Sequence, residues 1–529
     1  MSRAPQSPVT QIAGALHRHA MRLLAIWLRW ARHGEWIRDD VRYGLGVDVN
    51  ELSLLLRRLE PLGPETLPGD EDDTPQRAWR ELCDELEFLR RQDDAVAHRW
   101  LDAKSRLDLS DAELQLLALL VASSSEHALS RAFRYAWADF RRASMPLGFA
   151  VRLLSGTGEL GEGRSAELAA KVLPSSSGLY SHQLLSRVRE QTDTPLSELG
   201  LLAEDDTVAL LLGHALSIEG YATPTQLEAP PQRSEQLMTR VLQSLPAARA
   251  ENARCWLIHG PSGSGRSALA GQLARALCTG GVMQLDLGAA VESGLAEARI
   301  RRAIRCSSLL DACLVITGVE RLAKEQRQRW VEVIEERLQS TRLLWIWIAD
   351  EPMPELRIRP AGLVPIAYPS RGERLHVWRE TLRDRAFDGA LLEQLAGRFL
   401  LTEGQIARTV REAFSRAEFN SGKDNIVSLL ETVARRESAI GLGRLATPET
   451  KRVELSQLVV DEATRDLLHE IISYTQHRDR LAHEWGFERA MPYGLGVTAL
   501  FTGPPGTGKT MAANAIASAL GLELYRVDL

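Results

Sequence analysis

The sequence has little cysteine, no long uninterrupted apolar run in its amino-terminal part and no excess of basic charge. Its five cysteines are scattered and form no CxxC pair, which indicates neither a zinc site nor a disulfide framework and suits the reducing cytoplasm. The apolar run at residues 21–30 is broken by Arg22 and Arg29, so we expect no membrane span and no signal peptide. A net charge of -6 argues against a dedicated nucleic-acid partner.

The length of 529 residues predicts several domains, because one hydrophobic core rarely grows so large. The composition, 44% apolar and 25% charged, is that of a globular protein. Stretches rich in proline, glycine or acidic residues at 61–76, 222–233 and 440–448 are predicted linkers.

Two glycine-rich loops divide the second half of the chain into similar parts. The first loop is GPSGSGRS, from Gly260, and the second is GPPGTGKT, from Gly503. Each follows a predicted apolar strand, at 255–259 and 498–502, and precedes an Ala/Leu-rich helix and a strand that ends in Asp-Leu. The repetition predicts two tandem copies of one α/β fold.

The second loop fits the phosphate-binding pattern GxxxxGK[ST] at every fixed position. Glycines let backbone amides approach phosphates, and the start of the following helix adds positive potential. Lys509 is predicted to reach the β and γ phosphates of ATP, and the Thr510 hydroxyl is predicted to bind Mg²⁺. The predicted nucleotide-binding residues are Gly503, Pro504, Pro505, Gly506, Thr507, Gly508, Lys509, Thr510 and Met511.

This loop in its context resembles the AAA+ class of P-loop ATPases. The flanking segments WGF, GLG, ALF and LYRVDL at 485–487, 494–496, 499–501 and 524–529 resemble a bacterial AAA subfamily that often occurs with contractile injection systems. The resemblance implies a parallel sheet with a helical lid, ATP and Mg²⁺ as cofactors, and a homo-oligomeric ring, commonly a hexamer.

The first loop departs from the pattern of the class. Arg266 stands at the lysine position, and a planar guanidinium does not replace a compact ammonium among phosphate oxygens. Thr317 and Gly318 follow the predicted strand 313–316, where the class places two acidic residues, and the nearest acid is Glu320. We therefore expect a first module that keeps the fold without hydrolysis and that either still holds nucleotide or serves as a structural ring subunit. Its Arg266→Ala variant should leave ATP turnover nearly unchanged.

The resemblance assigns three further features to this first module. Asp350, after a strand predicted at 343–348, stands where the class has a polar sensor. The segment 368–375 resembles the passage into the helical lid. Arg408 is either a sensor-like arginine or a solvated helix residue, and we favour the solvated alternative.

The sequence stops after the predicted second strand of the second module. The acidic Mg²⁺ pair, the sensor, the arginine finger and the lid of that module would follow in a complete protein, so we expect a truncated chain with no catalytic residue for hydrolysis. A partial sheet leaves apolar surface uncovered, which predicts marginal stability for the last 80 or so residues.

The sequence predicts that the amino-terminal half is mostly helical. Ser110 and Glu113 form a predicted capping box before an apolar run at 114–121. A turn or wing is predicted at 173–180. Residues 126–154 resemble a winged-helix variant of some bacterial AAA+ proteins. Such a domain either packs and binds other proteins or binds DNA. The lack of a basic recognition helix favours the protein-interaction alternative. The helix carrying Trp27, Trp30, Arg18, Arg22, Arg29 and Arg32 either packs on a neighbour or docks a partner.

The predicted fold is multidomain. It comprises a helical region (1–100), a winged-helix-like domain (101–225), a degenerate AAA module with a helical lid (234–440) and the first part of a second AAA module (449–529). The predicted function is ATP-driven remodelling or assembly of a protein client. The alternatives are a nucleotide-binding adaptor without hydrolysis and a DNA-directed AAA+ protein.

Overall fold

The computed structural model describes residues 8–33, 74–137, 142–155, 177–189, 195–214, 219–222, 254–383, 387–419, 425–439, 447–449, 453–483, 497–520, 522 and 524–527. The chain divides into two compact units. The first comprises Met1–Gly260 and Gly265–Ile366, and the second comprises Pro261–Ser264 and Ala367–Leu529. The loop tip 261–264 thus groups with the second unit although its two neighbours in the chain belong to the first.

The first unit begins with a long amphipathic helix, α1 (Pro8–His33). Its apolar face is buried against α3 (Pro75–Arg91) and α5 (Asp111–Ser125), and Arg18 and Arg22 on its polar side pair with Glu85 and Glu81 of α3. The Trp27 ring meets the Phe149 ring edge-on at 5.5 Å. The packing interpretation of this helix is confirmed for Trp27; the side chains of residues 29–33 lie outside the described part.

Helices α4 (Ala95–Arg106), α6 (His127–Ala136), α7 (Leu147–Ser155), α9 (Gly178–Ser181) and α10 (Asp205–Leu212) complete this region with a small antiparallel sheet. The sheet has the order β1 (Met145–Pro146), β3 (Gly200–Ala203) and β2 (Leu185–Val188). The capping box of Ser110 and Glu113 at the start of α5 is confirmed. Of the turn or wing predicted at 173–180, residues 173–176 lie outside the described part, and Ser177 caps α9 instead.

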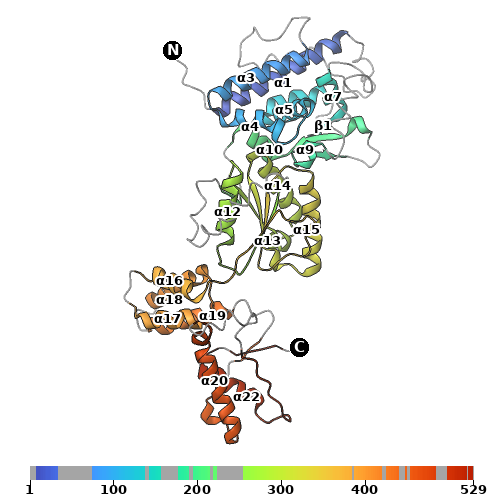
Figure 1. Cartoon of the computed structure of the whole chain (residues 1–529). Helices are drawn as coiled ribbons and strands as arrows, with labels where there is room; N and C mark the ends of the chain where they lie inside the picture. Colours follow the sequence, from blue (N-terminus) through green and yellow to red (C-terminus); the bar gives the residue numbers. More distant parts are fainter. Residues whose placement is uncertain are drawn as a thin grey trace. The chain divides into compact units, whose positions relative to one another are not determined.

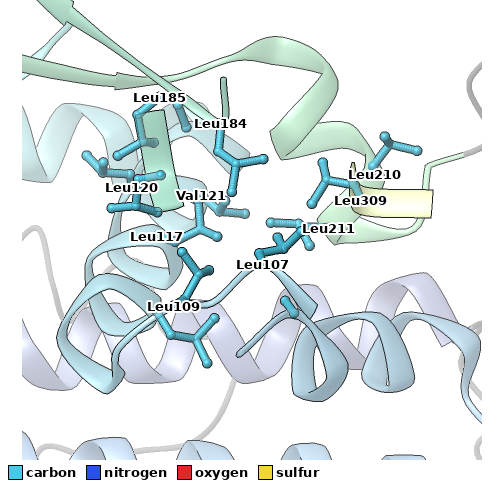
Figure 2. Packing of buried hydrophobic residues seen from close by; sticks show 14 of the residues in the cluster. Leu107, Leu109, Leu117, Leu120, Val121, Leu184, Leu185, Leu210, Leu211 and Leu309 are labelled. Atoms are coloured by element: carbon cyan, nitrogen blue, oxygen red, sulfur yellow. The ribbon is translucent and has the colours of Figure 1, made fainter. Parts of the chain in front are cut away.

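The core of this helical region continues into the larger sheet that follows. Leu309, from α14 (Ala296–Leu310), lies beside Leu210 and Leu211 of α10, and all three belong to one buried apolar cluster (Figure 2). The same cluster includes Leu314 and Trp347 on strands of that sheet. The helical region and the sheet therefore share a core within the first unit.

The sheet of the first unit is parallel except at one edge. Its strand order is β4 (Tyr221–Ala222), β6 (Val282–Asp286), β7 (Cys313–Thr317), β8 (Trp345–Ala349), β5 (Cys255–His259) and β9 (Gly362–Pro365), and β4 runs antiparallel. The predicted strand 255–259 is confirmed without change. The strands predicted at 313–316 and 343–348 are confirmed with ends shifted by one or two residues.

Alternate residues of each strand face opposite layers, as the pleat requires. Trp256 and Ile258 pack with α12 (Arg266–Leu277) on one face, while Leu257 belongs to the core on the side of α14 and α15 (Lys324–Gln339) (Figure 1). The short helix α13 (Leu287–Glu292) follows β6 directly. Both faces of the sheet are thus covered, as is usual for parallel strands.

The second unit contains a helical bundle followed by an open segment. The bundle consists of α16 (Arg371–Thr381), α17 (Gly389–Arg398), α18 (Glu403–Phe419) and α19 (Ile426–Ala439). Trp378, Leu395, Ile406 and Leu430 are buried in its core. A capping box of Ser370 and Glu373 starts α16, at the predicted passage into the lid.

The remaining elements are α20 (Glu462–His483), α22 (Lys509–Leu520) and a two-stranded antiparallel sheet of β10 (Thr447–Glu449) and β11 (Leu524–Arg526). The strand predicted at 498–502 is wrong, since residues 497–502 adopt no regular structure and Leu500 is 88% exposed. A strand needs a partner for its backbone groups. In the described part, β11 pairs with β10, and no strand lies beside 498–502.

The predicted linkers fall mostly outside the described residues, and their ends lie in regular elements. Thr74 caps α3, which begins at Pro75; Ala222 ends β4; and residues 447–448 begin β10. Proline suits the first turn of a helix, so Pro75 belongs to a helix start and not to a linker. Among the described helices, none is long and apolar enough to cross a membrane.

Candidate functional site

The two glycine-rich loops have nearly the same backbone conformation. The first, fourth and sixth positions have φ of +153°, +80° and +84° in the first loop and +146°, +84° and +88° in the second, at Gly260, Gly263 and Gly265 and at Gly503, Gly506 and Gly508. Side chains other than hydrogen are strained at such angles. The next residue, Arg266 or Lys509, begins a helix in both cases. The loops differ in their surroundings.

The second loop is open to solvent. A Cβ atom added to Gly506 or Gly508 would meet nothing within 4 Å. The Lys509 ammonium folds back on its own loop, where it donates to the carbonyl oxygens of Gly503 at 2.8 Å and Pro504 at 2.7 Å. These neutral acceptors hold an ammonium weakly compared with an anion.

The other predicted site residues surround this loop. Pro505 and Thr507 are exposed, and the Thr507 hydroxyl donates to the Pro504 carbonyl at 2.9 Å. Thr510 and Met511 lie exposed on the first turn of α22. The structure thus brings all nine residues together at the amino end of one helix.

Helix α22 holds the loop in place through its buried face. Ala512 and Ala515 pack against Leu468 of α20 in a small apolar cluster. The Asn514 amide, also buried, donates to the Thr510 carbonyl at 3.1 Å, a contact that the loop pattern does not predict. The amide is one turn from Thr510, so it steadies the turn that carries the hydroxyl.

The first loop contacts residues that are far from it in the sequence. The Arg266 guanidinium lies 2.6 Å from the Asp350 carboxylate, and its side chain is only 11% exposed. Asp350 follows β8, which pairs with β5 so that Ala349 lies opposite His259. The predicted sensor position therefore lies next to the loop, as the resemblance implies, but its carboxylate is joined to Arg266.

The tip of the first loop contacts the start of α18. The Thr402 hydroxyl donates to the Ser262 carbonyl at 2.9 Å, and the Gly404 amide donates to the Gly263 carbonyl at 2.9 Å. A Cβ atom at Gly263 would come within 2.6 Å of the Thr402 hydroxyl. Sequence reasoning missed both residues, because nothing in the pattern of the loop points to a partner so distant along the chain.

Two family models match the chain. The model of the ATPase family associated with various cellular activities (AAA) matches residues 499–529, and the model of the contractile injection system ATPase helical domain matches residues 370–439. Over these two segments the chain is similar to AAA ATPases and to the ATPases of contractile injection systems. The AAA match includes the second loop, and the helical-domain match coincides with α16 to α19.

Two solved structures are similar to parts of this chain. A structure of katanin, described in terms of its self-assembly, is 15% identical, with a TM-score of 0.32 over 42% of this chain and 91% of katanin. The AAA domain of FIGL-1 in complex with ADP is 15% identical, with a TM-score of 0.30 over 46% of this chain and 87% of FIGL-1. No curated protein matches the sequence.

The two positions directly after the predicted strand 313–316, where the resemblance implies acidic residues, are Thr317 and Gly318 and carry no acid. Thr317 ends β7, and Gly318 turns the chain in the left-handed region at φ +78°. Glu320 lies two residues after Gly318, in the turn Val319–Arg321. The Asp286 carboxylate lies close to Gly318 but is paired with Arg321 and caps α13, so it already has partners.

Arg408 forms an ion pair within the helical lid. Its guanidinium lies 3.1 Å from the carboxylate of Glu437 on α19, which is 7% exposed, while Arg408 itself is 47% exposed. The geometry fits a partly solvated residue that ties two lid helices together. In the described residues, no cluster of three or more His, Cys, Asp or Glu side chains could hold a metal ion.

Proposed function

We propose that the second loop binds the triphosphate of ATP with Mg²⁺ and that the protein is an ATP-driven remodelling or assembly factor. The observation that carries this proposal is the state of Lys509, an ammonium held by neutral carbonyls in an open loop at a helix start. Family membership as an ATP-binding AAA+ protein supports the same assignment.

The loop suits a polyphosphate for physical reasons. An incoming phosphate offers Lys509 charged acceptors in place of neutral carbonyls, and charge-assisted bonds are about twice as strong. The helix start and the glycine amides add donors aimed at the same place. Mg²⁺, when bound, neutralises phosphate charge, and the exposed Thr510 hydroxyl is the residue placed to ligate it.

The test is nucleotide binding by the full chain, measured by titration calorimetry with ATP and MgCl₂. Lys509→Ala should weaken binding by about tenfold to a hundredfold, since a hydrogen bond to a charged group contributes about 1.5–3 kcal/mol. Lys324→Ala, at an exposed position on α15, is the matched control and should leave affinity unchanged. Equal affinity for the Lys509 variant and the control would contradict the assignment.

Thr510→Ala tests the metal part separately. We expect this variant to bind ADP without Mg²⁺ as well as the wild type does, because Lys509 and the amides remain. The additional affinity that Mg²⁺ gives to ATP should fall in this variant. An undiminished Mg²⁺ effect would remove Thr510 from the metal site.

Within this proposal, the amino-terminal helical and winged-helix-like parts bind the protein client, and the AAA+ modules assemble as a ring. The small sheet and the short helices around it support a winged-helix-like domain. The start of α10 is acidic: Asp206 pairs with Arg302 at 3.1 Å, and Glu204 pairs with Arg305 at 3.0 Å. Acidic residues used in packing favour a protein-interaction role over duplex DNA.

Hydrolysis distinguishes the remodelling factor from a nucleotide-binding adaptor. A remodelling factor should turn over ATP steadily, and Lys509→Ala should abolish that turnover. Binding without turnover would instead favour the adaptor. Salt-dependent affinity for duplex DNA would favour the DNA-directed alternative, because counterion release gives such binding a steep dependence on salt.

A further inference from the structure

The lysine position of the first loop is already neutralised by the protein itself. Arg266 and Asp350 are 2.6 Å apart, and Arg266 is largely buried. Its counterpart Lys509 donates to neutral carbonyl oxygens of its own loop. A phosphate would therefore have to displace a carboxylate at Arg266, whereas it displaces only carbonyl groups at Lys509.

Asp350 also places a negative charge beside the loop. The Gly260 amide donates to the Ala349 carbonyl at 3.2 Å, so the residue after Ala349 lies next to the first residue of the loop. Like charges repel at short range, although the 43% exposure of the Asp350 side chain screens this repulsion in part. The carboxylate thus adds an unfavourable interaction for a phosphate at this loop.

The tip of the first loop is held by hydrogen bonds that need no anion. Thr402 and Gly404 donate to consecutive carbonyls of the tip, at Ser262 and Gly263. The Gln405 side chain accepts from the Thr402 amide at 2.8 Å, which fixes the donor segment in turn.

We propose that the first loop binds no nucleotide, because residues of the protein itself already pair with Arg266 and with the carbonyls of the loop tip. Asp350 stands in the place of a phosphate on Arg266, and the segment 402–405 keeps the loop in its shape. The first module then stays in one state while nucleotide binds and leaves the second loop. Its role is that of a fixed part of the assembly.

The first test is the number of nucleotides bound per full-length chain, measured by equilibrium dialysis with ATP and MgCl₂. We expect one per chain in the wild type and one in Arg266→Ala. Two per chain, falling to one in Arg266→Ala, would overturn the proposal. A wild type that binds none would contradict the proposed role of Lys509 and still agree with an empty first loop.

The second test asks whether the ion pair is what excludes nucleotide. Arg266→Lys combined with Asp350→Asn restores the ammonium and removes the carboxylate, and it should raise the stoichiometry by one nucleotide per chain. Arg266→Lys with Glu351→Gln is the matched control, because it makes the same change of charge one residue away, at an exposed side chain. The control should bind no additional nucleotide.

A folded double variant without the additional site would show that the ion pair does not exclude nucleotide. Thermal unfolding of each variant checks that it has folded. If the double variant unfolds, the number of nucleotides bound by the wild type still tests whether the first loop is empty.

Discussion

The Arg305 guanidinium of α14 lies 3.0 Å from the Glu204 carboxylate, directly before α10. It also donates to the Gln183 carbonyl at 3.0 Å and lies 3.7 Å from Asp206, and its side chain is 6% exposed. Next to it, the His182 ring meets the Ser308 hydroxyl at 2.7 Å. These polar contacts join the small-sheet region to the large parallel sheet, where both also share an apolar core.

Removing Arg305 should destabilise the first unit. Arg305→Ala removes the buried partner of the Glu204 carboxylate, while Asp206 keeps its pair with Arg302, and we expect a loss of about 3 kcal/mol in the free energy of unfolding. Urea denaturation followed by circular dichroism measures it. The control is Arg301→Ala, whose exposed pair with Glu297 should contribute at most about 0.5 kcal/mol. Equal losses in the two variants would contradict the importance of burial.

Two buried histidines should make the first unit sensitive to acid. Burial lowers the pKa of His19 to about 4, and burial together with nearby Arg106 lowers that of His182 to about 4. Below the ordinary histidine pKa near 6.5, these two imidazoles bind protons in the unfolded chain and stay neutral in the folded protein until the pH approaches 4. Stability is therefore intact above pH 6.5 and falls as the pH drops toward 4, by about 3 kcal/mol for each histidine.

Urea midpoints between pH 4.5 and 7 test this prediction. His19→Gln should reduce the dependence of stability on pH, because it removes one of the two groups. His127→Gln, at an exposed position, should leave that dependence as in the wild type. If His19→Gln behaved like His127→Gln, burial of His19 would not be the cause.

Two glycines should respond in opposite ways to alanine. A Cβ atom at Gly280 would come within 1.5 Å of the Leu310 carbonyl oxygen, so the backbone before β6 has to shift. We expect Gly280→Ala to cost about 2 kcal/mol or more. Gly372, in the first turn of α16, has nothing within 4 Å of the added atom, and Gly372→Ala should stabilise the lid by about 0.5 kcal/mol. Thermal unfolding measures both effects: the midpoint temperature should fall in Gly280→Ala and rise in Gly372→Ala.

Hydrogen exchange should separate the two loops. The segment with α20 and α22 has four buried apolar residues in its cluster, so its amides should exchange well before those of β7 and β8. Adding ATP with Mg²⁺ should slow exchange in residues 503–515 and leave residues 260–267 unchanged. Protection of α22 equal to that of β7 without nucleotide would refute its marginal stability.

Local sequence patterns predicted much of this fold. The apolar run before Gly260 is a strand, both loops lead into helices, and the capping box at Ser110 forms as expected. These features depend on neighbouring residues, which is why they can be read locally. The strand predicted at 498–502 fails for the opposite reason, because a strand exists only where another strand supplies its hydrogen bonds.

The sequence by itself determined the two glycine-rich loops, since their positive φ angles and helix starts follow from glycines at fixed spacing. It also marked Arg266 and Lys509 as the residues in which the loops differ. Only the tertiary structure decided what surrounds them. Asp350, directly after β8, pairs with Arg266, and Thr402, directly before α18, donates to the Ser262 carbonyl. Such partners are far apart along the chain, and only the packing of the folded protein brings their charges and hydrogen-bonding groups together.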